Sequence, residues 1–399
     1  MGSGANRSYF QGAKLNAYRL IAVCAFSLIL YACAPSLKLP ELEREDIEKE
    51  AELQRNLALD LRFEEQKKLL NVGHKILQTG APLCRDVSNS VGLFVWNAHF
   101  YDFKPYRSDI ARLYNLDRDI YVFHAVAGSP AEGAGIKAGA RIVSVNGHQM
   151  EPGPKASEQF AKALNDPLNN ETAQITYVQD DKVYETELPF DPVCDYRLIY
   201  EHENMEVNAY AAQTKAGKPR IIVTRGMMQF TNESELAGIM AHELAHHLLD
   251  HLDKGAMNIY AGRAVGAVLD WTEALIFLEK PDNDMRDYLG DKARRIYSQS
   301  FEAEADYLGL YIYFNAGYQI QDYASFWRRM ASEISISYID HAVTHPAGPE
   351  RTLLIGKVEE EIKRAVAKGN KKPIWPNLAS KVWSRAQLRY MHEGSHGNP

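Results

Sequence analysis

The sequence predicts an α+β protein, in which a mostly helical domain with a small edge sheet accompanies a separate β-rich module. Two observations lead to this prediction. Apolar residues recur at helical spacing through 231–254 and 294–316, and both segments also carry histidine or acidic residues. Residues 120–190 instead alternate short β-rich runs with glycine and asparagine turns. At 399 residues, the chain is long enough for two or three domains.

The charge of the chain argues against a nucleic-acid partner. The formal net charge is −7 at pH 7, and residues of both signs are spread along the sequence. A nucleic-acid-binding surface usually requires a clustered basic patch. We therefore expect no nucleic acid among the partners, and the sequence leaves the oligomeric state open.

Residues 1–33 resemble a signal segment that exports the chain. Basic residues precede an uncharged apolar run at 20–32, which suits a signal core better than a full membrane span. The run ends in Leu30-Tyr31-Ala32-Cys33, which resembles a bacterial lipobox. Cleavage there would leave Cys33 lipid-modified and tether the protein to the periplasmic side of a bacterial membrane. An uncleaved N-terminal anchor is the alternative.

The next segments lead into the β-rich module. Residues 34–80 are charged and carry leucines at helical spacing, so we expect one long amphipathic helix or two shorter ones. Residues 81–115 would form a connecting segment. Cys84 and Cys194 flank the module on its two sides. In an oxidising periplasm such a pair favours a disulfide, with two buried free thiols as the alternative.

The β-rich module is expected at residues 116–190. Residues 120–147 combine a Gly-Ser-Pro turn, a short helix, a glycine turn and an Asn-Gly turn, and this run resembles a PDZ domain of the bacterial protease type. A second helix is expected at Ala156–Leu164, followed by two strands. The resemblance implies that the module binds an extended peptide as an added strand, with a carboxylate-binding loop near Tyr114–Leu116.

The HELAH motif carries the strongest chemical signal. It places His242, Glu243 and His246 on the predicted helix 231–254. Residues four apart share one face of a helix, so the two histidines can offer imidazole nitrogens to a single metal ion. Glu243 lies beside that face and can take a proton from a water molecule on the metal. This is the arrangement that a zinc hydrolase needs.

A second predicted helix can complete the metal site. Zinc in hydrolases usually has three protein ligands and a water molecule, so two histidines leave it one ligand short. Glu302 and Asp306 lie four residues apart among large apolar residues, where acidic groups need a buried partner. We take Glu302 as the third ligand of one Zn²⁺ per chain. Asp306 would then hydrogen-bond a ligating histidine, His242 in particular, while Glu304 is expected to point away.

HELAH at 242–246, followed by FEAEAD at 301–306, resembles the zinc metallopeptidase (gluzincin) family of the CAAX prenyl proteases and HtpX-type proteases. Within that family, the PDZ-like run and the lipobox indicate a bacterial exported lipoprotein branch with an inserted PDZ domain. The resemblance implies a mostly helical zincin metallopeptidase domain with a small edge sheet. We place this domain at 191–355, followed by a C-terminal helical tail at 356–399.

The same resemblance assigns two further stretches to the active site. In this family an edge strand borders the cleft, and Asn208, Ala209 and Tyr210 match it here. We expect this strand to pair with an extended substrate. His345 lies in a Thr-His-Pro stretch similar to a late family motif, so it would stabilise an oxyanion or compete for the metal. The alternative is a structural histidine before a helix. Other histidines, His251 among them, are expected on the surface or in the core.

The sequence thus predicts a zinc-dependent endopeptidase of the cell envelope, acting in protein quality control. Glu243 would be its general base, and the PDZ domain would recruit or gate protein or peptide substrates. Two alternatives stay open. One is a membrane-associated peptide-binding or chaperone protein with little or no proteolysis, and the other is a site-2-type intramembrane protease. Residues 255–278 are apolar, but charged residues interrupt them, which disfavours a full membrane span.

Overall fold

The computed structural model describes residues 40–99, 106–166, 171–214, 217–254, 284–334 and 349–376, and for 284–299 it describes the backbone alone. The predicted signal segment 1–33, the apolar stretch 255–278 and His345 lie outside the described residues. Residue contacts divide the chain into two units, residues 1–55 and 56–399. The cores, the sheets and the candidate site lie in the second unit.

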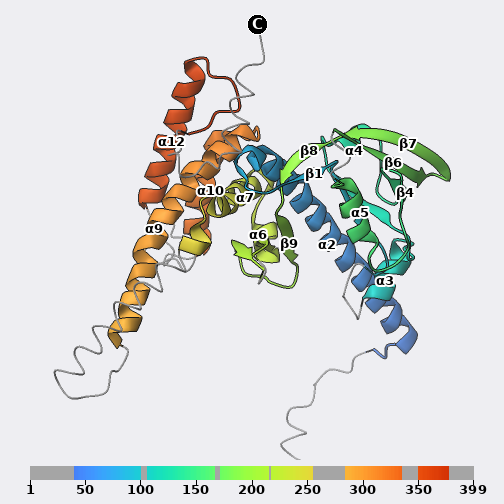
Figure 1. Cartoon of the computed structure of the whole chain (residues 1–399). Coiled ribbons are helices and arrows are strands. Elements are labelled where there is room, and N and C mark those ends of the chain that lie inside the picture. Colours follow the sequence, from blue (N-terminus) through green and yellow to red (C-terminus); the bar gives the residue numbers. More distant parts are fainter. Residues whose placement is uncertain are drawn as a thin grey trace, which may run out of the picture. The chain divides into compact units, whose positions relative to one another are not determined.

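A single helix, α2 (Arg44–Gly80), accounts for most of the region in which we predicted one or two amphipathic helices (Figure 1). Its last three turns are largely buried, with Leu69, Val72 and Ile76 in the main hydrophobic core. A short 3₁₀ helix, η1 (Ala81–Leu83), ends this segment. The helix therefore forms part of the folded body.

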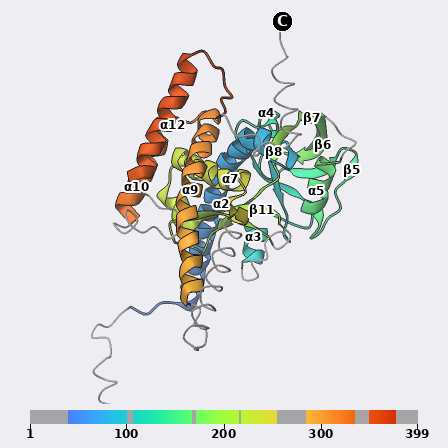
Figure 2. The ribbon, with the colours of Figure 1, turned by 60° about the vertical axis from the view of Figure 1, so that its left-hand side comes forward.

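The helical domain contains a three-stranded sheet and several long helices (Figures 1 and 2). The sheet has the order β10-β11-β9, in which β10 is antiparallel and β9 parallel to the central strand. The strands are β9 (Arg197–Glu201), β10 (Ala209–Gln213) and β11 (Pro219–Thr224). The helices are α6 (Arg225–Phe230), α7 (Glu233–Leu248), α9 (Asp284–Asn315), α10 (Ile320–Ile334) and α12 (Pro349–Ala367).

Three sequence-based boundaries in this domain need correction. We predicted one helix over 231–254, but α7 ends at Leu248. We expected the tail to begin at residue 356, yet α12 begins at Pro349 and buries Ile355, Val358 and Ile362 in the main core. We predicted a single strand ending at Asn208, Ala209 and Tyr210, but residues 197–213 form two strands, β9 and β10. Each of these boundaries depends on a turn or on a contact between distant parts of the chain, and the local periodicity of apolar residues predicts neither.

The β-rich module is built on a six-stranded antiparallel sheet with the order β2-β3-β4-β6-β7, in which β5 pairs with β4. Its strands are β2 (Leu93–Trp96), β3 (Tyr121–Ala125), β4 (Arg141–Val145), β5 (His148–Gln149), β6 (Thr172–Gln179) and β7 (Lys182–Pro189). Its helices are α3 (Arg107–Leu113), α4 (Pro130–Gly133) and α5 (Ala156–Leu164). The mixture of helical domain and antiparallel sheet agrees with the predicted α+β class.

The sheet of this module begins earlier in the chain than the expected start at residue 116. β2 comes from the segment 81–115, which we had treated as a connection, and it pairs antiparallel with β3. The expected helix at Ala156–Leu164 and the turn at Asn146-Gly147 are present, with positive φ angles of 50° and 77° at the two turn residues. Local turn chemistry therefore predicted the interior of the module better than its boundary.

A disulfide between Cys84 and Cys194 confirms the predicted pairing. Beside it, β1 (Val87–Ser90) and β8 (Asp191–Cys194) form a two-stranded antiparallel sheet. The bridge and this sheet hold together the two chain segments that lead into and out of the β-rich module. Both cysteines are buried in the main core.

Within the described residues, no helix combines the length and the apolar character needed to cross a membrane.

Gly309 lets α9 approach the backbone of α7 closely. A Cβ atom at Gly309 would lie 3.1 Å from both the backbone nitrogen and the Cα of His242. Ala305, one helical turn before Gly309 on α9, is also fully buried. Because Glu302 lies on the same helix as Gly309, this packing sets its distance from α7.

We predict that Gly309→Val destabilises the fold by about 1–3 kcal/mol, because the added methyl groups meet the backbone of α7. Gly356→Val is the matched control, since a Cβ at that helical position has no neighbour within 4 Å. The control should leave the free energy of unfolding unchanged or slightly increased. Denaturant unfolding of both variants measures the difference, and equal effects would contradict the close packing.

Candidate metal centre

The start of α7 is fixed by a capping box. The Asn232 side chain accepts a hydrogen bond from the Glu235 backbone N–H at 3.0 Å, and the Glu235 carboxylate accepts one from the Asn232 backbone N–H at the same distance. This reciprocal pair satisfies two backbone donors that a helix start leaves without partners. Arg329 of α10 also donates to the Glu235 carboxylate at 2.7 Å. The helix that carries the HELAH motif is therefore anchored at its first turn.

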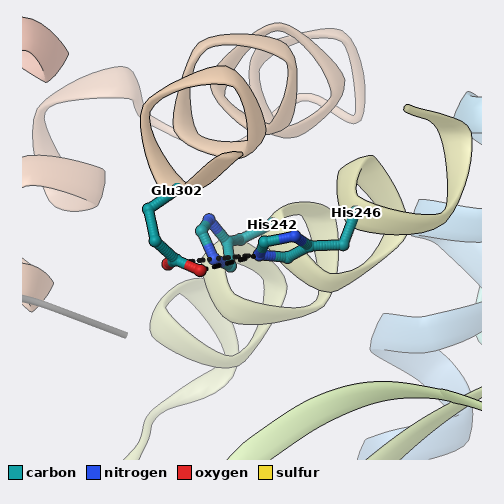
Figure 3. A group of neighbouring side chains, drawn as sticks. All are labelled: His242, His246 and Glu302. Atoms are coloured by element: carbon teal, nitrogen blue, oxygen red, sulfur yellow. Dashed lines mark hydrogen bonds and ion pairs between the residues drawn. The ribbon is translucent and has the colours of Figure 1, made fainter. Parts of the chain in front are cut away.

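Three predicted ligands converge between α7 and α9 (Figure 3). The Nε2 atoms of His242 and His246 lie 3.0 Å apart, and each lies 3.2 Å from one carboxylate oxygen of Glu302. All three side chains are at least nine-tenths buried. Two imidazoles on α7 thus face one carboxylate on α9, which reaches them from a helix some sixty residues away in sequence.

The donor set fits a zinc ion. Zinc–nitrogen and zinc–oxygen bonds of about 2.0–2.2 Å in a tetrahedron place neighbouring ligand atoms about 3.3–3.5 Å apart. The observed separations of 3.0–3.2 Å approach that value. Two imidazoles and one carboxylate are also a known ligand set of catalytic zinc, which leaves a fourth position for water or substrate. The cluster could therefore hold Zn²⁺ with little rearrangement.

Asp306 lies one helical turn beyond Glu302 and fixes the ring of His242. The His242 Nδ1 lies 2.9 Å from Asp306 Oδ1, so that the ring donates its proton there and keeps Nε2 for the metal. Arg351 of α12 then donates to both Asp306 oxygens, from Nε at 2.6 Å and from Nη2 at 2.7 Å. Its guanidinium lies 3.3 Å from the centre of the Trp327 ring. A buried cation thus balances a buried carboxylate.

The pKa shifts reflect this compensation. Burial would raise the pKa of the Asp306 carboxyl, but Arg351 and His242 outweigh burial and lower the pKa below its ordinary value. Burial and the Arg351 charge would lower the pKa of His242, yet the hydrogen bonds to Asp306 and Glu302 raise it to about 9. Without a metal, a proton therefore binds His242 well, because the same acidic groups that attract a cation surround it.

Glu243 lies next to the ligands and points toward the sheet. It is buried, and its Oε2 accepts a hydrogen bond from the Ala211 backbone N–H at 2.7 Å. This contact shows that the N–H of Ala211 faces away from β11. Since backbone directions alternate along a strand, the N–H of Ala209 faces the same side, and that of Ala212 faces β11. In the described sheet, β10 is the edge strand, and its outer side contacts Glu243, the neighbour of His242 on α7.

The predicted edge-strand residues contribute in different ways. Asn208 precedes β10, and its backbone N–H donates to Thr224 Oγ1 at 3.1 Å. Ala209 begins the strand opposite Val223. The Tyr210 hydroxyl donates to Glu201 at 2.6 Å, a contact that links β10 to the end of β9.

His251 departs from our expectation, because it contacts a predicted ligand. Its Nδ1 lies 3.0 Å from His246 Nδ1, and its Nε2 lies 3.0 Å from Glu304 Oε2. Glu304 does point away from Glu302 as predicted, but it faces His251. Burial is the largest cause that lowers the pKa of His251, to about 4. We had assumed an unbroken helix over 231–254. On such a helix His246 and His251 would lie on different faces, so we did not expect them to be in contact.

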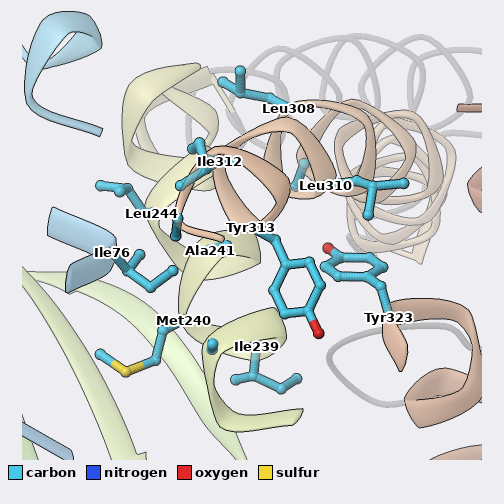
Figure 4. Close-up of a cluster of buried hydrophobic side chains, with 14 of the residues drawn as sticks. Ile76, Ile239, Met240, Ala241, Leu244, Leu308, Leu310, Ile312, Tyr313 and Tyr323 are labelled. Atoms are coloured by element: carbon cyan, nitrogen blue, oxygen red, sulfur yellow. The ribbon is translucent and has the colours of Figure 1, made fainter. Parts of the chain in front are cut away.

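Apolar side chains of α7 form part of the main hydrophobic core (Figure 4). Met240, Ala241 and Leu244 project among residues of α2 and α9 such as Ile76 and Leu308. All five are buried to at least 99%. The metal cluster therefore occupies one side of a helix whose other sides are held by close-packed apolar groups.

Comparison with known proteins points to a peptidase. Residues 169–358 match the model of Peptidase family M48. The mitochondrial metalloendopeptidase OMA1 of Arabidopsis thaliana is 26% identical over 160 residues, which cover 38% of this chain and 29% of that protein. The protein of the same name from Schizosaccharomyces pombe is 28% identical over 173 residues, covering 40% of this chain and 48% of that protein. The matches span less than half the length of each relative.

A solved structure, the HtrA3 PDZ domain bound to a phage-derived ligand, resembles part of the chain. It covers 27% of this chain and 89% of that chain, with 17% identity and a TM-score of 0.21. A TM-score this low carries no weight for the fold of the β-rich module. The M48 match and the two relatives together support a zinc metalloendopeptidase. The finer placement in the CAAX and HtpX branch stays a prediction.

The contact between Asp306 and Arg351 gives a testable energetic prediction. Asp306→Ala or Arg351→Ala alone should cost about 3–5 kcal/mol, because each leaves an uncompensated buried charge. The double variant should cost less than the sum of the two, by about 1–3 kcal/mol, since it removes both charges. Denaturant unfolding of the metal-free proteins completes this double-mutant cycle, and strictly additive losses would rule out the ion pair.

Proposed function

We propose that this chain is a zinc-dependent endopeptidase that hydrolyses extended peptide segments. The observation that carries the proposal is the convergence of His242, His246 and Glu302, with Glu243 beside them. The M48 match over 169–358 and the relatives named as metalloendopeptidases support it. Three ligands and an adjacent carboxylate are the groups that metal-assisted hydrolysis requires.

The residues around the cluster divide the chemistry between them. His242, His246 and Glu302 would hold a zinc ion, which would supply Lewis acidity toward water and toward the carbonyl of the peptide. Glu243 takes a proton from the attacking water and later returns it to the leaving amine. Asp306 and Arg351 hold His242 in orientation throughout. His345 would add oxyanion stabilisation, an assignment that rests on the sequence motif alone.

The outer side of β10 offers a place for the substrate backbone. An extended peptide paired there would run past the metal cluster, with the N–H of Ala209 available to its carbonyl groups. The Ala211 N–H is donated to Glu243 in this structure. This bond holds the general base beside the strand that would carry the peptide. We propose that Asn208, Ala209 and Tyr210 form this substrate-binding edge.

We further propose that the β-rich module recruits or gates substrates in the manner of a PDZ domain. A pocket of about 370 Å³ lies between β2 and α5, lined among others by Phe94 and Phe160. The expected carboxylate loop near Tyr114–Leu116 is not part of its lining; Tyr114 instead packs on Phe63 of α2. Binding of extended peptides to the full chain, measured by fluorescence anisotropy, tests this role.

Helix α2 supports the gating proposal, because it touches both the pocket and the metal helix. Leu70 and His74 line the pocket. On the same helix, a Cβ at Gly73 would lie 2.8 Å from Met240, and one at Gly80 would lie 2.6 Å from Leu244. Met240 and Leu244 both belong to α7. If peptide binding at the pocket shifted α2, the contacts of α2 with Met240 and Leu244 would transmit the shift to α7, which carries the HELAH motif.

We propose that the enzyme acts in a bacterial cell envelope, lipid-anchored at Cys33, in protein quality control. The support is the basic, then apolar, then lipobox-like pattern of residues 1–33. The disulfide between Cys84 and Cys194 agrees with an oxidising compartment. Fractionation of cells that express the full chain bears directly on this location.

Glu243→Gln should reduce cleavage of a casein-type substrate by at least about 10²–10⁴-fold while one zinc per chain remains bound. The substitution keeps the size of the side chain and removes its basicity. His242→Ala is the comparison, because it should lose both zinc and cleavage. Metal analysis together with cleavage assays with and without a chelator distinguishes the two variants. Undiminished cleavage by Glu243→Gln would exclude Glu243 as the base.

Ala209→Pro should lower cleavage without loss of zinc, since it removes an N–H on the outer side of β10 and leaves the pairing with β11 intact. Ala212→Pro is the matched control on the same strand. Its N–H faces β11, so this variant should lower the thermal stability of the protein as well. If Ala209→Pro cleaved extended peptides as fast as the wild type, β10 would not hold the substrate.

A further inference from the structure

The helical path is interrupted directly after α7. Asp250 adopts a positive φ of 55°, and residues 251–254 are helical again. Aspartate is among the few residues that tolerate this left-handed conformation. On an uninterrupted helix, a residue five positions after His246 would be rotated by about 140° from it. The break at Asp250 instead returns His251 to the side of His246.

His251 fills this position with two polar contacts and one apolar contact. Its ring stacks on Phe301, with ring centres 4.4 Å apart and planes at 16°. Its Nδ1 faces His246 Nδ1 at 3.0 Å, and its Nε2 faces Glu304 at 3.0 Å. The His251 side chain is 3% exposed, whereas that of Glu304 is 58% exposed. The imidazole is therefore held between a buried neighbour and a solvated carboxylate.

With a metal ion on the Nε2 atoms of the cluster, the remaining contacts determine which nitrogen of His251 and of His246 carries a proton. A carboxylate only accepts hydrogen bonds, so the Nε2 of His251 must be the donor to Glu304. In a neutral ring, Nδ1 of His251 is then an acceptor, and His246 must donate its own Nδ1 proton to it. That leaves the Nε2 of His246 with a lone pair directed at His242 and Glu302. This is the nitrogen that a metal at the cluster would use.

We propose that His251 is a positioning residue for the metal site, which holds His246 in the Nδ1-protonated form and fixes the plane of its ring. The role mirrors that of Asp306 toward His242, but with an imidazole in place of a carboxylate. Each ligating histidine thus has its own anchor, supplied in one case by α9 and in the other by the turn after α7. The inference rests on the proposed zinc site, since it concerns how that site is held.

The test compares two substitutions, each of which keeps one property of His251 and loses another. His251→Phe keeps a ring that can stack on Phe301 but has no acceptor for His246. His251→Asn loses the ring but can place an amide oxygen near the former Nδ1. The apparent zinc affinity of each purified full-length variant is measured by competition with a chromophoric chelator at one pH. Melting temperatures of the metal-free proteins are measured alongside.

We expect zinc affinity to fall by about 10- to 100-fold in His251→Phe. His251→Asn should recover most of this loss, although it packs less well. Equal affinity of wild type and His251→Phe would overturn the proposal, as would an equal loss in both variants at matched melting temperatures. A wild-type protein that binds no zinc would instead contradict the proposed function itself, so the two failures are distinguishable.

A second measurement uses the wild-type protein and so does not depend on the folding of a variant. In the zinc-loaded chain with ¹⁵N-labelled histidine, heteronuclear NMR reports which ring nitrogen of each histidine carries the proton. The proposal requires His251 to be protonated on Nε2 and His246 on Nδ1. A proton on Nδ1 of His251 would overturn it, because His246 would then have no acceptor there.

Discussion

The ion pair between Asp306 and Arg351 is the interaction on which the metal cluster depends. Glu302, Asp306, His242 and His246 bring two carboxylates and two imidazoles into one buried volume. Without a buried cation, their burial would be strongly unfavourable. Arg351 supplies that cation from α12, where both of its contacts with Asp306 are shorter than 2.8 Å. The last described helix therefore completes a site whose ligands lie on two earlier ones.

Within the described residues, the scaffold around the site combines close apolar packing on α7 with an edge strand, β10, beside Glu243. The apolar sides of α7 are held by α2 and α9, and Gly309 lets α9 approach to backbone contact. The side that remains faces the outer side of β10, where Glu243 is held by the Ala211 N–H. Such an arrangement holds the proposed ligands and the proposed base in place, and in the described sheet it keeps β10 at the edge, where we propose that an extended partner pairs. The chemistry and the proposed substrate position thus follow from the same packing.

The site residues that could be predicted from the sequence are those that lie about one helical turn apart. His242 with His246, and Glu302 with Asp306, are each four residues apart, so helical periodicity alone placed each pair on one face. Arg351 received no role, because its contact with Asp306 spans 45 residues and depends on α12. His251 was misplaced because nothing in the periodicity marks the left-handed residue at Asp250. The bond between Glu243 and Ala211 depends on sheet geometry, which a single helical motif does not contain.

We propose that one zinc ion binds between α7 and α9, and the rest of the proposed chemistry depends on it. Anomalous diffraction from crystals of the zinc-loaded protein at the zinc absorption edge tests it most directly. The account predicts one strong peak per chain, about 2.0–2.2 Å from the Nε2 atoms of His242 and His246 and from a carboxylate oxygen of Glu302. A peak bound by other residues, or a zinc-loaded chain in which Glu302 is not a ligand, would contradict it.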